Sequence, residues 1–333
     1  MPRIEISYLN GADVGALEMT PDEILDAIED SLAAQGRGET VIEPRMHLVA
    51  DEAFRGHFNV LRGYIAPIGI AGVKVVGDYI DNYRKGLPSE MALVNLFDAR
   101  TGMPRALVDG TAITDMRTGA LTALGAKYLA RSTPRRLGHI GARGSSYWNV
   151  RLLDHLFDFA EIRVHSRRPE SREAFGERLT RDLGKPVIVT EDWQSCLEGA
   201  DILVEASRLE TPQPLLKTAW VEPGALVIPY GTISAVEDDL ADVMDKIVVD
   251  HWQQCLVGPF GCLRRHVDSG RITADTIHGE IGAICAGLAS GRESDSERIL
   301  FWHRGLSTSD IALAWAMLAK AEKLGVGTAL PYA

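Results

Sequence analysis

The chain has 333 residues, of which 46% are hydrophobic and 24% charged, so it is long enough for a sizeable core and for two domains. Its formal charge of -11 makes nucleic acids and anionic membrane surfaces poor partners, because an acidic surface repels phosphate groups. An anionic substrate would need a local group of Arg or Lys residues. There is no basic start followed by an apolar run and no stretch of about 18 apolar residues. We therefore expect a cytoplasmic protein without a membrane span.

The cysteines and histidines predict neither a disulfide framework nor a metal site. The four cysteines show no Cys-x-x-Cys or Cys-His ligand spacing, and the nine histidines contain no pair spaced as His-x-x-x-His. Buried, reduced thiols in an intracellular protein are the simplest interpretation. The four positions are Cys196, Cys255, Cys262 and Cys285.

The N-terminal part of the chain predicts one helix followed by a sheet. Thr20 can cap a helix over residues 20–36, and Pro21 suits its first turn. Residues 46–110 contain short apolar runs separated by turn residues, notably at 86–88 and 98–102. This pattern indicates a twisted antiparallel sheet with one flanking helix.

The pattern changes in the second part of the chain. Residues 114–131 are predicted to be helical, and from residue 136 strands alternate with helices. This alternation predicts a parallel, doubly wound sheet. Residues 307–325 have the pattern of a strongly amphipathic helix, which we expect to return and pack on the first domain.

A glycine-rich turn, Gly-Ala-Arg-Gly-Ser-Ser at 141–146, follows the first strand of the alternating region and precedes a helix. A Rossmann turn needs Gly at the sharp bend and small residues at the pyrophosphate and the helix–strand contact. Gly141 fits the bend and Ser146 can fit the last position. Arg143 occupies the position of the second glycine, and Gly144 is displaced by one. The turn is either a dinucleotide site, to which Ser145 would also belong, or an ordinary loop.

The next strand ends in His-Ser-Arg-Arg, and this ending bears on the choice of cofactor. A site specific for NAD usually places Asp or Glu here to bind the ribose hydroxyl. Ser166, Arg167 and Arg168 would instead suit the 2′-phosphate of NADP(H). The alternative is a solvated basic start of the following helix.

Three cations in the first half of the chain are candidates for binding an anionic substrate. Arg45 lies just before a predicted strand, Lys74 lies within the apolar run AGVKVV, and Arg117 lies early in the 114–131 helix. A Lys between valines either reaches out to a sheet edge or faces a polar site. Singly, each cation is explained by structure alone; together they could hold a carboxylate.

Several segments of the chain resemble the ornithine cyclodeaminase/mu-crystallin family. These segments are GVKVV at 72–76, the run from 86 to 130, GADILVEAS at 199–207, and the stretches 215–227, 246–250 and 304–332. The resemblance implies a Rossmann domain plus a substrate domain built from both chain ends, paired as a homodimer. The family includes amino-acid cyclodeaminases, an archaeal-type alanine dehydrogenase and ketimine reductases. By resemblance, Arg45, Lys74 and Arg117 match its carboxylate-binding residues.

We accordingly predict an α/β chain with two domains. The α+β substrate and dimerisation domain comprises residues 1–125 with 305–333, and the Rossmann-type dinucleotide-binding domain comprises 126–304. Thr118 and Ser207 are expected to join the cofactor site.

Two departures from the family pattern affect the expected chemistry. The usual GAG turn is replaced by GARGSS, and Ile233 aligns with an Asp that serves ring closure and ammonia loss in the cyclodeaminases. Glu90, on the strand near Lys74, either supplies a carboxyl group to the site or is an ordinary surface residue.

The predicted function is that of an NAD(P)(H)-dependent oxidoreductase acting on the Cα–N bond of a small amino or imino acid. Lys74 is the leading proton-transfer candidate, because a partly desolvated Lys can have a lowered pKa. One alternative is a cyclodeaminase that recycles its NAD and releases ammonia. Another is a non-catalytic dinucleotide- or ligand-binding protein.

Overall fold

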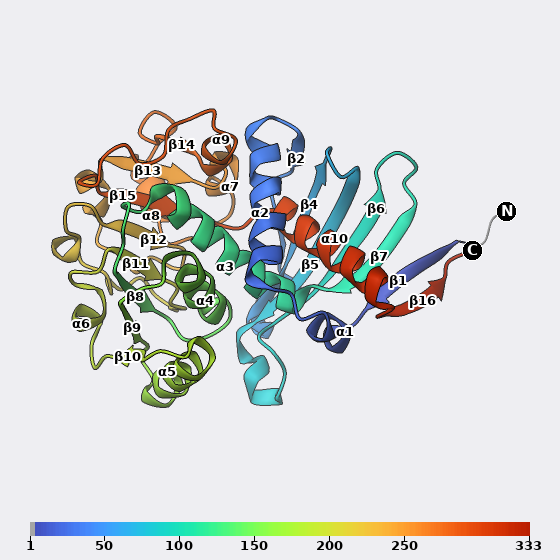
Figure 1. Cartoon of the computed structure of the whole chain (residues 1–333), viewed down its shortest axis with the longest axis horizontal. Coiled ribbons are helices and arrows are strands. Elements are labelled where there is room, and N and C mark those ends of the chain that lie inside the picture. Colours follow the sequence, from blue (N-terminus) through green and yellow to red (C-terminus); the bar gives the residue numbers. More distant parts are fainter. Residues whose placement is uncertain (1–3) are drawn as a thin grey trace. The chain divides into compact units, whose positions relative to one another are not determined.

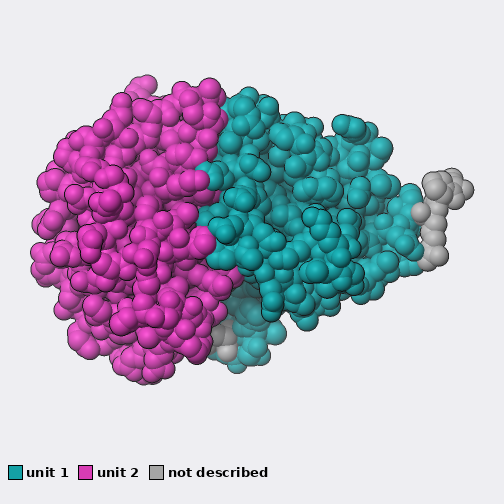
Figure 2. All heavy atoms as spheres, in the orientation of Figure 1, with its two compact units in different colours: residues 1–117, 306–333 teal, residues 118–305 magenta. Residues whose placement is uncertain are grey.

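The computed structural model describes residues 4–333, except for the side chain of Tyr83. It divides into two compact units, shown in teal and magenta in Figure 2. Unit 1 comprises residues up to Arg117 and from Leu306 onward, and unit 2 comprises Thr118–Gly305. The boundary predicted after residue 125 therefore lies inside unit 2. No helix among the described residues is long and apolar enough to span a membrane.

Unit 1 is built on an eight-stranded sheet in the order β16-β1-β7-β6-β5-β4-β2, with β3 also pairing with β4 (Figure 1). Strands β4 to β7 form the predicted antiparallel meander. β1 runs parallel to β7, but β1 lies outside residues 46–110, for which the antiparallel sheet was predicted. The strands are β1 (Glu5–Leu9), β2 (Thr40–Ile42), β3 (Met46–Leu48), β4 (Gly56–Ile65), β5 (Ile70–Tyr79), β6 (Glu90–Asp98), β7 (Pro104–Asp109) and β16 (Thr328–Pro331).

Three α-helices belong wholly to unit 1. α2 begins as predicted, because the Thr20 side chain accepts the N–H of Glu23 at 3.2 Å and the Glu23 carboxylate accepts the N–H of Thr20 at 2.8 Å. α10 packs against β4 and β5, and α2 packs against α10 (Figure 1). The helices are α1 (Gly11–Ala16), α2 (Pro21–Gly36) and α10 (Ser307–Leu324), with short 3₁₀ segments at Glu52–Phe54 and Ile80–Lys85.

The first two turns of α10 are buried on every side, so the predicted amphipathic helix is found only in its later turns. Two glycines that face each other across β4 and β5, Gly63 and Gly72, let α10 approach the sheet closely. A Cβ atom on Gly63 would lie 2.6 Å from Ser307 Oγ, and one on Gly72 would lie 2.7 Å from Ile311 Cγ1. The helix can therefore lie this close to the sheet only because Gly63 and Gly72 carry no side chain.

Unit 2 contains an entirely parallel sheet in the order β10-β9-β8-β11-β12-β15-β13-β14. The first strand, β8, lies inside the sheet, and the strand order reverses between β8 and β11, as in dinucleotide-binding Rossmann folds. The predicted fold class is confirmed. The strands are β8 (Arg136–Ile140), β9 (Glu161–His165), β10 (Ile188–Val189), β11 (Ile202–Glu205), β12 (Leu226–Pro229), β13 (Lys246–Val249), β14 (Gly279–Glu280) and β15 (Ile299–Trp302).

The parallel strands of unit 2 are connected by helices and irregular segments. α3 begins in unit 1 and ends in unit 2. All four cysteines are free thiols. The helices are α3 (Gly110–Leu129), α4 (Ser146–Phe157), α5 (Pro169–Leu183), α6 (Trp193–Leu197), α7 (Trp252–Cys255), α8 (Arg264–Asp268) and α9 (Ile281–Cys285), with 3₁₀ segments at Thr218–Trp220 and Leu240–Val243.

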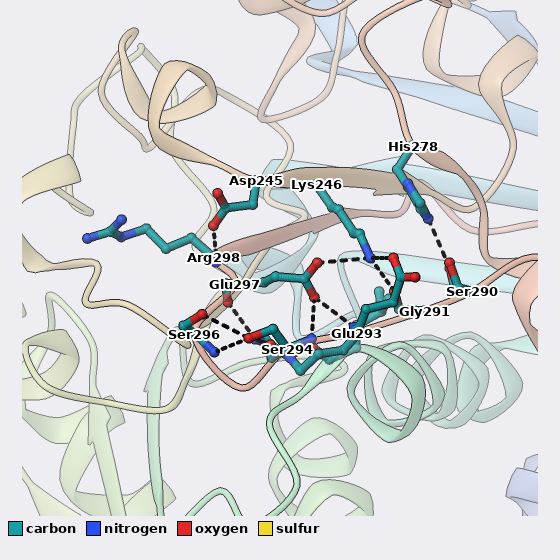
Figure 3. Close-up of polar contacts among 12 residues, drawn as sticks. Asp245, Lys246, His278, Ser290, Gly291, Glu293, Ser294, Ser296, Glu297 and Arg298 are labelled. Carbon is teal, nitrogen blue, oxygen red and sulfur yellow. Dashed lines mark hydrogen bonds and ion pairs between the residues drawn. The ribbon is translucent and has the colours of Figure 1, made fainter.

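The connection between α9 and β15 has no regular structure and is held by polar contacts, which Figure 3 shows. Lys246 Nζ donates to the carbonyl of Gly291 at 2.8 Å and contacts the carboxylates of Glu293 at 2.5 Å and Glu297 at 3.0 Å. The Glu297 carboxylate also accepts the backbone N–H groups of Glu293 and Ser294. One lysine on β13 thus fixes this loop to the sheet.

Candidate active site

Lys74 lies on the buried face of β5, and only 2% of it is exposed. Its ammonium group donates to Asp310 Oδ1 at 2.8 Å and to Thr114 Oγ1 at 3.2 Å. Side chains alternate along a strand, so the flanking valines point to the opposite face. Lys74 therefore faces a buried polar cluster and does not reach out to a sheet edge.

Arg117 belongs to the same cluster. Its Nε donates to Asp310 Oδ1 at 3.0 Å, and Arg117 is 8% exposed while Asp310 is fully buried. Two of the three predicted cations thus share one carboxylate. Sequence reasoning missed Asp310, although the polar run Ser-Thr-Ser-Asp at the start of an otherwise apolar helix was a signal.

The buried surroundings of Lys74 lower its pKa to about 8, because burial disfavours the charged ammonium. The negative charge of Asp310 opposes this effect, and the positive charge of Arg117 adds to it. A lysine in this range can both carry and release a proton near neutral pH, as a proton-transfer group must.

Glu90 and Arg45 belong to different parts of the unit 1 sheet: Glu90 begins β6, and Arg45 precedes β3, which pairs with β4. Lys74 is paired with Val94, and Glu90 precedes Val94 by four residues on β6, so the side chains of Glu90 and Lys74 are on one face. The charge of Glu90 also acts to raise the pKa of Lys74. Arg45 is half-buried one residue before β3.

The glycine-rich turn leaves β8 in a conformation that only glycine accepts easily. Gly141 has a φ of 111°, and a Cβ there would lie 2.6 Å from the carbonyl oxygen of Ala206. Gly144 also has a positive φ, of 56°. Ser146 is buried at the start of α4, where its hydroxyl donates to the carbonyl of Arg143 at 2.9 Å. The turn has the tight bend that a dinucleotide site requires.

The N-terminus of α4 has no side-chain cap. Ser145 occupies the N-cap position, but its hydroxyl bonds the hydroxyl of Tyr230 at 2.8 Å and makes no cap bond. The N–H of Ser146 donates to the carbonyl of Arg143 at 3.3 Å, and no side chain caps the N–H groups that follow it; a phosphate is the acceptor that such helix ends favour. The turn and helix fit the pyrophosphate of a dinucleotide.

Tyr230 was not predicted, and it organises the region beside the turn. Asn149 Nδ2 donates to the Tyr230 hydroxyl at 2.5 Å and contacts His139 Nε2 at 3.0 Å. The Tyr230 ring stacks on His303, with 4.5 Å between ring centroids. Burial lowers the pKa of His139 to about 4, so this ring is neutral at neutral pH.

The end of β9 presents the two arginines predicted to bind a 2′-phosphate. Arg167 and Arg168 are exposed, and neither forms an ion pair with a described residue. Arg168 is the N-cap of α5 and makes no side-chain cap bond. The preceding His165 is buried and donates from Nδ1 to the carbonyl of Thr190 at 2.7 Å. Ser166, which lies between His165 and Arg167 in the chain, is half-buried.

The two remaining predicted cofactor residues, Ser207 and Thr118, are less exposed than Arg167 and Arg168. Ser207 donates its N–H and its hydroxyl to Glu205 Oε1, at 2.7 and 2.5 Å. Glu205 is fully buried at the end of β11, and burial raises its pKa. Thr118 is buried on α3.

Ile233 is half-buried in the segment after β12. The acids that follow it already have structural partners, because Glu237 accepts the N–H of Thr218 and Asp239 accepts its hydroxyl. Asp238 pairs with Arg265 at 3.2 Å. Each of these three carboxylates therefore already has a partner within unit 2.

Comparison with known proteins agrees with this architecture. The chain matches the ornithine cyclodeaminase/mu-crystallin family over residues 7–324. It is 31% identical to an alanine dehydrogenase of Archaeoglobus fulgidus, across 99% of both chains. The structure of Thermococcus litoralis Δ1-pyrroline-2-carboxylate reductase with NADH and L-proline is similar, with a TM-score of 0.90, 28% identity and coverage of 97% of this chain and 99% of that one.

An archaeal alanine dehydrogenase dimer with bound NAD also has a TM-score of 0.90, with 29% identity and coverage of 99% of this chain and 100% of that one. The likeness extends over both units. This chain belongs to the ornithine cyclodeaminase/mu-crystallin family.

Proposed function

We propose that this protein is an NAD(P)-dependent oxidoreductase that acts on the Cα–N bond of a small amino or imino acid. The observation that carries the proposal is the buried cluster of Lys74, Arg117 and Asp310. The relatives support the same class of reaction, since they include an alanine dehydrogenase and a Δ1-pyrroline-2-carboxylate reductase. Stoichiometric oxidation of NAD(P)H by an imino acid is the expected result, and rapid release of proline and ammonia from ornithine with catalytic NAD would contradict the proposal.

The residues of unit 1 supply binding and proton transfer. Arg117, Lys74 and Arg45 would hold the substrate carboxylate through charge-assisted hydrogen bonds and so fix the position of Cα. Lys74 would donate a proton to the amine formed by reduction, or accept one in oxidation. Glu90 would contribute a carboxyl group in addition to that of Asp310, from the face of the sheet that carries Lys74.

Unit 2 would hold the nicotinamide dinucleotide. The bend at Gly141, the backbone at Arg143 and Gly144, and the uncapped start of α4 at Ser145 and Ser146 would bind its pyrophosphate. Thr118, Ser166 and Ser207 are proposed to complete this site. When bound, the dinucleotide would supply or accept the hydride.

The cyclodeaminase alternative is disfavoured by Ile233. Ring closure of a diamino acid needs a base that deprotonates the distal amine, and an aliphatic side chain cannot accept a proton. A simple imine reduction or amine oxidation needs no such base. A non-catalytic binding protein would not require a lysine with a pKa shifted to about 8 beside two other charged groups.

Tighter binding of NADPH than of NADH is the expected result of calorimetry on the two cofactors. The related structures hold NADH and NAD, so the preference for a 2′-phosphate rests on Arg167 and Arg168 of this chain. Replacing both by Ala should weaken NADPH about tenfold or more and leave NADH unchanged. Arg265→Ala, an exposed arginine elsewhere in unit 2, is the control. Equal affinities in the wild type would show that these arginines only face solvent.

A homodimer is proposed through the outer face of the unit 1 sheet. The strand register aligns exposed apolar side chains there, including Met46, Val75, Met91 and Leu93, which are 36–58% exposed. Apolar patches of this kind mark protein interfaces, and the related alanine dehydrogenase is a dimer. Leu93→Lys should convert the dimer to a monomer in light scattering, whereas Val243→Lys in unit 2 should not. A wild-type monomer would contradict the proposal.

A further inference from the structure

Three elements of unit 1 meet at a single carboxylate oxygen. Asp310 Oδ1 on α10 accepts from Lys74 on β5 at 2.8 Å and from Arg117 on α3 at 3.0 Å. All three side chains are at least nine-tenths buried. Because Asp310 has a short side chain, its carboxylate can reach both cations only if α10 lies deep against the sheet.

The depth of α10 is set by the backbone. Ser307 lies on Gly63 and Ile311 lies on Gly72, and these contacts leave no room for a Cβ on either glycine. Asp310 is the residue before Ile311, so the same fit that seats Ile311 also fixes Asp310. The carboxylate is therefore placed by close packing and does not depend on a flexible side chain.

Asp310 is needed to keep Lys74 protonated, because burial and the nearby positive charge of Arg117 both favour the neutral amine. Two groups oppose them: Asp310, which bonds the ammonium directly, and Glu90 from β6, which acts more weakly. Thr114, from α3, contributes a hydroxyl without charge. Without the Asp310 carboxylate, Lys74 would lose its proton at a lower pH and Arg117 would lose the acceptor that orients it.

We infer that Asp310 is a positioning residue for the reaction proposed above: it holds Lys74 and Arg117 side by side for the substrate carboxylate and keeps Lys74 protonated for transfer. The inference rests on the proposed function. Asp310 acts through the two cations, and no direct contact with substrate is required of it.

The test is the pH profile of kcat/KM for Asp310→Asn, measured as NAD(P)H oxidation with an imino acid. The variant keeps the shape of the side chain and removes its charge. We expect kcat/KM at pH 7 to fall about 10- to 100-fold and the basic limb of the profile to move to lower pH. Ser309→Ala, a buried neighbour on the same helix, should keep the wild-type profile. An unshifted limb in Asp310→Asn would overturn the inference.

A binding measurement separates this inference from the proposed function. Pyrrole-2-carboxylate is a planar carboxylate that cannot be reduced as an imine, and its affinity can be followed by calorimetry across pH even if no substrate turns over. Affinity in the wild type should decline above pH 8, and in Asp310→Asn it should decline at lower pH. The same pH dependence in both proteins would contradict the positioning role.

If Asp310→Asn alone does not fold, a further variant tests the inference through its ability to fold. The triple variant Asp310→Asn, Lys74→Met, Arg117→Met removes both buried cations together with the carboxylate that they share, so it should recover the folded state. Failure of the triple variant to fold would show that Asp310 serves the fold rather than the two cations.

Discussion

Replacing Lys74 by methionine is expected to lower kcat by about 10²–10⁴-fold, the usual contribution of a general acid or base. Methionine fills a similar volume but carries no proton. Because the pKa of Lys74 lies at about 8, the wild-type rate of reduction should fall as the pH rises above that value. The rate of oxidation should rise over the same range, since it needs the neutral amine. The variant should show neither change.

The stability of the Lys74 variant distinguishes a catalytic defect from a folding defect. Folding lowers the pKa of Lys74 from 10.5, so the folded state binds this proton less tightly than the unfolded chain does. Folding is therefore disfavoured by this group below pH 8, and the penalty fades as the pH rises toward 10.5. Lys74→Met should not lower the melting temperature at pH 7, and Lys85→Met, an exposed control, should keep full activity. Wild-type kinetics in a folded Lys74 variant would contradict its role.

Replacing Arg117 by alanine should weaken substrate binding by one to two orders of magnitude. Losing one charge-assisted hydrogen bond to a carboxylate costs about 1.5–3 kcal/mol, which corresponds to roughly a 10- to 100-fold change in affinity. Asp310 keeps its bond to Lys74 in this variant, so the fold should persist. The measurement is KM, with circular dichroism to verify folding.

The control for Arg117→Ala is Arg100→Ala, which removes an exposed arginine from the hairpin at 98–102 of the same unit. It should have wild-type KM. Unchanged KM in a folded Arg117→Ala would remove Arg117 from the carboxylate site.

Local sequence signals predicted much of the fold. Thr20 and Pro21 marked the start of α2, and alternating strands and helices predicted the parallel sheet of unit 2. These signals act over a few residues, so they can be identified without the fold. The family resemblance was confirmed by the match over residues 7–324. Lys74 was identifiable because a charged residue within an apolar strand is rarely buried unless it faces a polar site.

The remaining features depend on contacts between distant parts of the chain. Asp310 lies 236 residues from Lys74 and 193 from Arg117, and an acid near a helix start has an ordinary explanation in the helix dipole. The deep burial of α10 depends on Gly63 and Gly72, whose pairing appears only once β4 and β5 are in register. Tyr230 gave no signal in the sequence, since its partners come from α4 and from His303.

The most direct test of the proposed reaction compares two incubations of the pure enzyme. In one, NAD(P)H is supplied with a panel of cyclic and linear imino acids, and cofactor oxidation is followed by absorbance. In the other, ornithine is supplied with catalytic NAD, and proline and ammonia are measured. We predict stoichiometric consumption of NAD(P)H with at least one imino acid and little proline from ornithine. Rapid, equimolar release of proline and ammonia from ornithine, without net NAD(P)H turnover, would contradict it.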